Sequence, residues 1–170
     1  MIKNVKIGKH TYSYEFPWSG KTKLRSSRSQ PIAFDTETEV VEEGIPRIAL
    51  ATASTGYQSC ILHPSQVPYF IETHKDSYWV GHNIPFDFWV VNKYLEDNGR
   101  HDAKSVLWQI SDTNRLFDTM IFDMLLRLAK GDGEKGGDPE TGIWPRDLGM
   151  VAKQFCPSLP VNKEDPFRMR

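Results

Sequence analysis

The chain has 170 residues, which suffices for one domain with a hydrophobic core but not for two large domains. A formal net charge of −1 excludes an overall basic field, and only 2 cysteines exclude a disulfide framework. No apolar run reaches membrane-spanning length, and the N-terminus lacks the apolar core of a signal peptide. We therefore expect no membrane partner and a cytoplasmic location, in a bacterium or a phage-infected host cell.

Residues 1–30 form a basic first segment, with seven lysines and arginines against one acid, Glu15. Strand-forming residues on both sides of Gly8 and Lys9 predict a hairpin over residues 5–16, and residues 19–30 are typical of a basic, flexible connector. Two interpretations of the hairpin remain open. Its aromatic residues pack on the domain, or its interleaved aromatics and lysines hold single-stranded nucleic acid.

The next part of the chain is predicted to contain four strands and two helices. The apolar run Ile32–Phe34 predicts a buried strand. The two strands that follow should be antiparallel, because only the turn Thr55-Gly56 joins them. The predicted elements are strands at residues 31–38, 47–54, 57–62 and 78–81 and helices at residues 64–74 and 85–95.

The remainder is predicted to be mainly helical. Asp118 or Thr119 caps the helix with the clearest spacing of apolar residues at three and four positions. The predicted elements are strands, or one interrupted strand, at residues 106–110 and 115–117, helices at 118–129 and 146–155, a glycine-rich loop at 131–142 and a polar tail at 157–170. Early strands followed by alternating helices and strands predict an α/β fold, a mixed sheet flanked by helices.

Two carboxylates, Asp35 and Glu37, stand where the first buried strand ends. Because side chains alternate across a strand, both acids should lie on one face of the sheet. Two neighbouring carboxylates repel each other unless a cation lies between them, so this strand end is a candidate site for a hard divalent metal. The alternative is a solvated acidic turn.

A second acidic motif, Val80-Gly-His-Asn-Ile-Pro-Phe-Asp87, favours the metal site. The predicted strand ends at Gly81, and a helix begins near Pro85, because proline is tolerated in a first helical turn. Asp87 then lies in that first turn and faces Asp35 and Glu37 if the two strands are neighbours. Phe86 is predicted to be buried beneath the turn.

These residues resemble the DEDD-type 3′–5′ exonucleases, and among them the proofreading domains of A-family DNA polymerases most closely. The first motif of that family matches residues 34–38 and the second matches Gly81-His82-Asn83 with Asp87. Residues 117–120, Phe-Asp-Thr-Met, and the helix at 146–155 are similar to later segments of the polymerase domains. The resemblance runs in order from about residue 31 to residue 155, and the predicted exonuclease-like domain spans residues 31–156.

The resemblance implies an RNase H-like fold and two ions, Mg²⁺ or Mn²⁺, about 3.5–4 Å apart. Asp35 would bridge both ions, Glu37 would hold the inner ion and orient the attacking water, and Asp87 would hold the outer ion. The expected substrate contacts are Thr36, His82 and Asn83. For His82 an ordinary loop role remains equally open. The implied substrate is the 3′ end of a single strand, with DNA favoured over RNA.

The family's third motif, a Tyr or His followed four residues later by a last metal-binding Asp, has no counterpart before Arg170. We therefore expect a domain that is incomplete at its C-terminus and nearly inactive alone. A polymerase domain or a complementing chain is a possible partner of such a piece. An alternative function is a non-catalytic module that binds nucleic acid or serves as a scaffold with an exonuclease-like fold.

Overall fold

The structure is a computed structural model that describes residues 1–7, 10–20, 23–40, 44–131 and 148–158. The chain divides into two compact units, Met1–Phe117 and Asp118–Arg170. The first unit contains the sheet and the first three α-helices, and the second contains the last two helices. Within the described ranges, no helix combines the length and the apolarity that crossing a bilayer requires.

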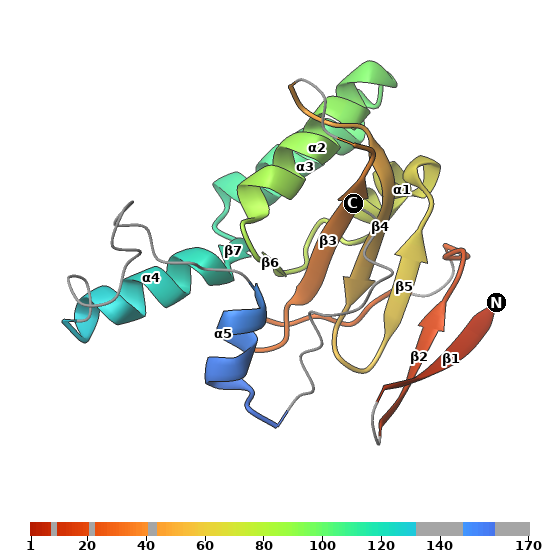
Figure 1. Cartoon of the computed structure of the whole chain (residues 1–170). Helices are drawn as coiled ribbons and strands as arrows, with labels where there is room; N and C mark the ends of the chain where they lie inside the picture. The colour runs from red at the N-terminus through yellow and green to blue at the C-terminus, as the bar shows by residue number, and fades with distance from the viewer. Residues whose placement is uncertain (8–9, 21–22, 41–43, 132–147, 159–170) are drawn as a thin grey trace. The chain divides into compact units, whose positions relative to one another are not determined.

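A seven-stranded mixed sheet runs in the order β1-β2-β5-β4-β3-β6-β7 (Figure 1). β3 lies at its centre, antiparallel to β4 and parallel to β6. β1 and β2 form an antiparallel hairpin that joins the sheet through parallel pairing of β2 with β5. The strands are β1 (Ile2–Ile7), β2 (His10–Glu15), β3 (Ile32–Thr38), β4 (Ile48–Ser54), β5 (Ser59–Leu62), β6 (Trp79–Gly81) and β7 (Leu116–Asp118).

The hydrophobic core lies against the buried face of β3. Ile32, Phe34 and Thr36 are buried and the residues between them are exposed, as a period of two requires. The ring of Phe34 lies 6.5 Å from that of Phe70 and 5.2 Å from that of Trp79, measured between centroids. The helices of this unit are η1 (Pro64–Gln66), α1 (Val67–Thr73), α2 (Ile84–Asp97) and α3 (His101–Asp112), and α1 and α2 both pack against α3.

The N-terminal hairpin forms as predicted, and its turn at Gly8 and Lys9 falls outside the described residues. The connector that follows is predicted to be flexible, but the structure buries its Leu24 and the preceding Trp18. The backbone N–H of Leu24 donates a hydrogen bond of 2.9 Å to His74 Nε2. One leucine within a basic, polar stretch therefore anchors this segment, which composition alone did not indicate.

The strand predicted at residues 106–110 is wrong, because these residues lie inside α3. Ala103, Leu107 and Ile110 are the buried residues of this helix, and their spacing of four and three is that of one helical face. A short apolar run fits a buried strand and a buried helix equally well, which explains the error. The strand predicted at residues 115–117 is confirmed as β7.

The second unit contains α4 (Thr119–Ala129) and α5 (Leu148–Phe155). Asp118 caps α4 as predicted, since its Oδ1 accepts a 2.8 Å hydrogen bond from the N–H of Met120. Arg127 donates to the buried carboxylate of Asp123 at 2.8 Å and to Gln154 of α5 at 2.8 Å. The predicted loop at 131–142 lies, after Gly131, outside the described residues, as does the tail from residue 159 onward.

Candidate active site

The end of β3 places two acids on its exposed face. Asp35 and Glu37 are exposed, whereas Thr36 between them is buried, at 7% exposure. Opposite them on β4, the pairing shifts register between Glu37 and Thr38, so the ladder contains a bulge just where the acids lie. Bulges of this kind redirect side chains and occur often beside active sites. The predicted placement of both acids on one face is thus confirmed.

The second acidic motif forms a tight connection between β6 and α2. A Cβ at Gly81 would collide with the side chain of Ile84, so a larger residue here would require that side chain to move. Asn83, at the N-cap, adopts the left-handed conformation with φ of 59°. α2 then begins at Ile84 with Pro85 in its first turn, as predicted, and Asp87 lies in that turn.

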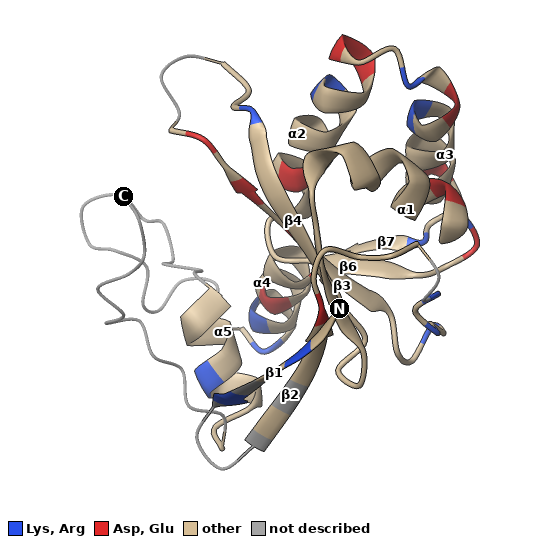
Figure 2. Ribbon diagram, turned by 90° about the vertical axis from the view of Figure 1, so that its right-hand side faces the viewer, with Lys and Arg blue, Asp and Glu red and all other residues tan. Residues whose placement is uncertain are grey.

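Asp87 joins the two motifs. Its side chain is almost fully buried, at 3% exposure, and its Oδ1 accepts two hydrogen bonds from Thr36. The backbone N–H of Thr36 donates at 2.8 Å and the Thr36 hydroxyl donates at 2.6 Å. Hydrogen bonds to a carboxylate are stronger than those between neutral groups, so this pair fixes the start of α2 against the end of β3. Figure 2 shows the acidic residues of β3 and α2 in red.

The donor chemistry of this region suits a hard divalent cation, because Asp35, Glu37 and Asp87 offer only carboxylate oxygens. However, in the part of the chain that the structure describes, no three His, Cys, Asp or Glu side chains are grouped so that they could hold one ion. The structure brings Asp87 to the backbone between the two strand acids. Convergence of the three acids on metal remains a prediction.

The three expected substrate contacts occupy different environments. The Thr36 side chain points away from the exposed acids and is engaged with Asp87, because alternation along β3 turns it to the buried face. Asn83 is exposed and His82 is partly exposed, both on the loop before α2. Substrate contact by these three residues stays a prediction. The sequence did not predict the hydrogen bond from the Thr36 hydroxyl to Asp87. The position of Thr36 between two exposed strand acids could have indicated that its hydroxyl is buried.

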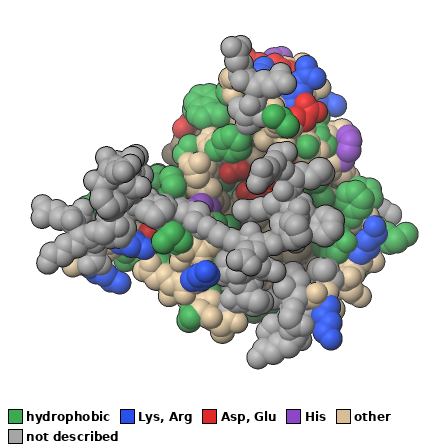
Figure 3. All heavy atoms as spheres, in the orientation of Figure 1, with side chains coloured by type: hydrophobic (Ala, Val, Ile, Leu, Met, Phe, Trp, Pro, Cys, Tyr) green, Lys and Arg blue, Asp and Glu red, His purple; other side chains and the backbone are tan. Residues whose placement is uncertain are grey.

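Phe86 was predicted to be buried beneath the turn. This prediction is wrong, because the residue is 42% exposed. Ile84, Asp87 and Phe88 take the buried positions of this turn instead, so Phe86 faces outward. The space-filling view shows acidic side chains with hydrophobic side chains beside them (Figure 3). The exposure of Phe86, which precedes Asp87 in the chain, was not anticipated from the sequence.

The fold has a counterpart among solved structures. The EXO domain of Nibbler from Aedes aegypti superimposes with a TM-score of 0.53 at 15% sequence identity. The match covers 83% of this chain and 65% of that chain, so the present chain spans somewhat less than two thirds of its length. No family model matches the sequence, and no curated protein matches it. The chain therefore has an RNase H-like α/β fold, of the kind seen in an exonuclease domain.

Proposed function

We propose that this chain is a 3′–5′ exonuclease domain that removes nucleotides from the 3′ end of a nucleic-acid single strand, with DNA as the favoured substrate. The observation that carries the proposal is the double hydrogen bond between Thr36 and Asp87. It brings the second acidic motif to the strand that bears Asp35 and Glu37. The fold shared with an EXO domain supports this assignment.

In the proposed reaction, a water molecule gives up one proton as its oxygen bonds to the last phosphorus, and the bond from that phosphorus to the 3′ oxygen breaks. The 3′ oxygen takes up a proton, so the strand ends in a new 3′ hydroxyl and a 5′-mononucleotide leaves. Divalent ions supply activation of the water and stabilisation of the departing oxygen. Asp35 and Glu37 would hold such ions, because they are exposed and share one face of β3. Asp87, buried and fixed by Thr36, would complete the set of carboxylates. Asn83 and His82 would contact the terminal nucleotide.

The test is 3′ trimming of a 5′-labelled single strand, as DNA and as RNA, with Mg²⁺ or Mn²⁺. Loss of a residue that only hydrogen-bonds to a metal ligand lowers activity roughly 10- to 100-fold. We expect Asp35→Asn and Glu37→Gln each to lower the rate of trimming by more than this, because they would remove a metal ligand itself. Asp102→Asn is the matched control, since Asp102 is an exposed acid in the first turn of α3. Mn²⁺ binding without substrate should weaken in the same two variants. Trimming that survives Asp35→Asn would contradict the proposal.

A second candidate, a non-catalytic module that binds nucleic acid, is favoured by one observation. In the described ranges, no three potential ligands are grouped for a metal ion. In that case the labelled strand would bind in EDTA and would not be shortened after addition of either metal. The predicted N-terminal arm belongs to both candidates. Lys3 lies 5.3 Å from the centre of the Phe16 ring, and strand binding by this hairpin stays a prediction.

A further inference from the structure

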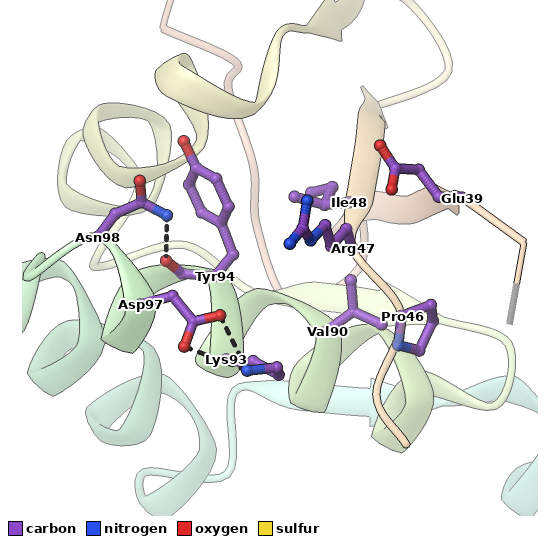
Figure 4. Close-up of a pocket in the computed structure, with 9 residues that line it drawn as sticks. All are labelled: Glu39, Pro46, Arg47, Ile48, Val90, Lys93, Tyr94, Asp97 and Asn98. Atoms are coloured by element: carbon purple, nitrogen blue, oxygen red, sulfur yellow. Dashed lines mark hydrogen bonds and ion pairs between the residues drawn. The ribbon is translucent and has the colours of Figure 1, made fainter. Parts of the chain in front are cut away.

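A groove runs along α2, between this helix and residues 39 and 44–48. Two adjoining cavities form it, of about 530 Å³ near the start of α2 and about 330 Å³ near its end. Pro46 and Val90 line both cavities and so connect them. The first is lined by Gly44, Ile45, Pro46, Pro85, Phe86, Trp89 and Val90; the second by Glu39, Pro46, Arg47, Ile48, Val90, Lys93, Tyr94, Asp97 and Asn98 (Figure 4).

The first half of the groove is aromatic and accessible. Phe86 is 42% exposed and Trp89 is 46% exposed, and they are three positions apart on one face of α2. Ile45, opposite them on the β3–β4 connection, is 39% exposed. Exposed aromatic rings in a groove are the feature on which bases of a single strand stack without regard to sequence.

The second half of the groove carries two cations. Lys93 forms an ion pair with Asp97 at 2.9 Å, so its charge is largely offset. Arg47 lines the same cavity from the other side and extends across it toward Tyr94 (Figure 4). Arg47 forms no ion pair with any residue in the described ranges. Its guanidinium is therefore suited to a phosphate, the anion that arginine binds through paired N–H groups.

Two residues that line the groove are close in sequence to the acids of the proposed site. Phe86 directly precedes Asp87 in α2, and Glu39 lies two residues beyond Glu37. From Phe86 to Lys93 the helix rises about 10 Å, at about 1.5 Å per residue. A stacked strand advances about 3.4 Å along its axis per nucleotide, so this length accommodates more than one nucleotide. An occupant of the groove would extend along α2 from Phe86, the residue that precedes Asp87.

We propose that this groove binds the nucleotides upstream of the 3′-terminal one, with Trp89 stacking a base and Arg47 contacting a phosphate. The proposal rests on the proposed function and adds to it a binding track along α2. These contacts involve the flat face of a base and the charge of the backbone, which every nucleotide has. The groove should therefore bind strands of any sequence. Asp97 acts against binding, because it neutralises Lys93.

The test measures the affinity of labelled oligothymidylates of two to eight nucleotides for the full chain carrying Asp35→Asn, in EDTA. In this background affinity should rise with length. Trp89→Ala should lower the affinity for longer strands about tenfold, within the range for loss of one base–aromatic stack, and leave the dinucleotide little changed. Because Trp89 also contacts Phe88 and Trp108, Trp89→Leu, which keeps an apolar side chain, serves as a second variant.

Charge substitutions give an independent readout that does not disturb packing. Arg47→Gln should reduce the slope of log affinity against log salt by about 1, and Asp97→Asn should tighten binding by releasing Lys93. The matched control is Arg100→Gln, since Arg100 is an exposed arginine outside the groove, and its slope should equal that of the Asp35→Asn background.

The outcomes separate this inference from the proposed function. Trimming by the wild-type chain with unchanged affinities for Trp89→Leu and Arg47→Gln would refute the groove and keep the exonuclease. Weakened binding in these variants without trimming under any metal would keep the groove and contradict 3′ trimming by this chain. Absence of strand binding by the Asp35→Asn chain at low salt would refute the groove directly.

Discussion

A buried histidine should make the first unit sensitive to acid. His74 is fully buried, its Nε2 accepts the N–H of Leu24 at 2.9 Å and its Nδ1 lies 2.8 Å from the carbonyl oxygen of Phe70. Only the neutral ring with the proton on Nδ1 makes both hydrogen bonds. Burial lowers the pKa of His74 below its usual value, the hydrogen bond to Phe70 opposes this, and Lys23 adds to the lowering.

The sign follows from the two states of the chain. Unfolded, His74 takes up a proton near its ordinary pKa of 6.5, whereas the folded chain resists protonation. The free energy of unfolding is therefore at its full value above about pH 6.5 and falls as the pH drops below it. The slope cannot exceed about 1.4 kcal/mol per pH unit for one group, so pH 5.5 would cost up to about 1.4 kcal/mol relative to pH 7.5.

The variant His74→Gln isolates this contribution. A glutamine amide oxygen can accept the N–H of Leu24 but does not titrate, so the acid sensitivity should disappear. Loss of the ring, whose centroid lies 4.1 Å from that of Phe70, should cost roughly 1–3 kcal/mol at pH 7.5. Urea unfolding at intervals from pH 5.5 to pH 8 measures both effects. Curves for the two proteins that remain parallel across this range would refute the reasoning.

Two further predictions concern single contacts. Thr36→Val removes a hydroxyl donor from the buried Asp87 and should destabilise the chain by about 1–3 kcal/mol in urea unfolding, whereas Thr36→Ser keeps the donor and should cost less; equal losses would show that the hydroxyl is unimportant. Burial raises the pKa of Cys60 to about 12, so iodoacetamide should label the exposed Cys156 and leave Cys60 until the chain unfolds; mass spectrometry of the native protein showing labelled Cys60 would contradict this.

The sequence predicted much of the fold because several signals agree in each element. The β3 strand combines an apolar run with strict alternation, and α2 combines a glycine exit, an early proline and apolar spacing. Where only one signal was present, the prediction failed, as at residues 106–110, whose apolar run contains no feature that separates a strand from a buried helix. The prediction of a flexible connector failed for a different reason. It depends on His74, fifty residues away, and no local pattern encodes that contact.

The candidate site shows the same division between local and long-range information. Alternation alone places Asp35 and Glu37 on one face, so that part required only the strand. That Asp87 is held by Thr36 depends on β3 and β6 being parallel neighbours, which the sequence allowed but did not require. The groove is less predictable still, because residues 39 and 44–48 line one side of it and one face of α2 lines the other. Ile84 and Phe88 occupy the buried face of α2, and Phe86 and Trp89 are therefore exposed. The aromatic surface of the groove therefore depends on which neighbouring residues of α2 pack into the core.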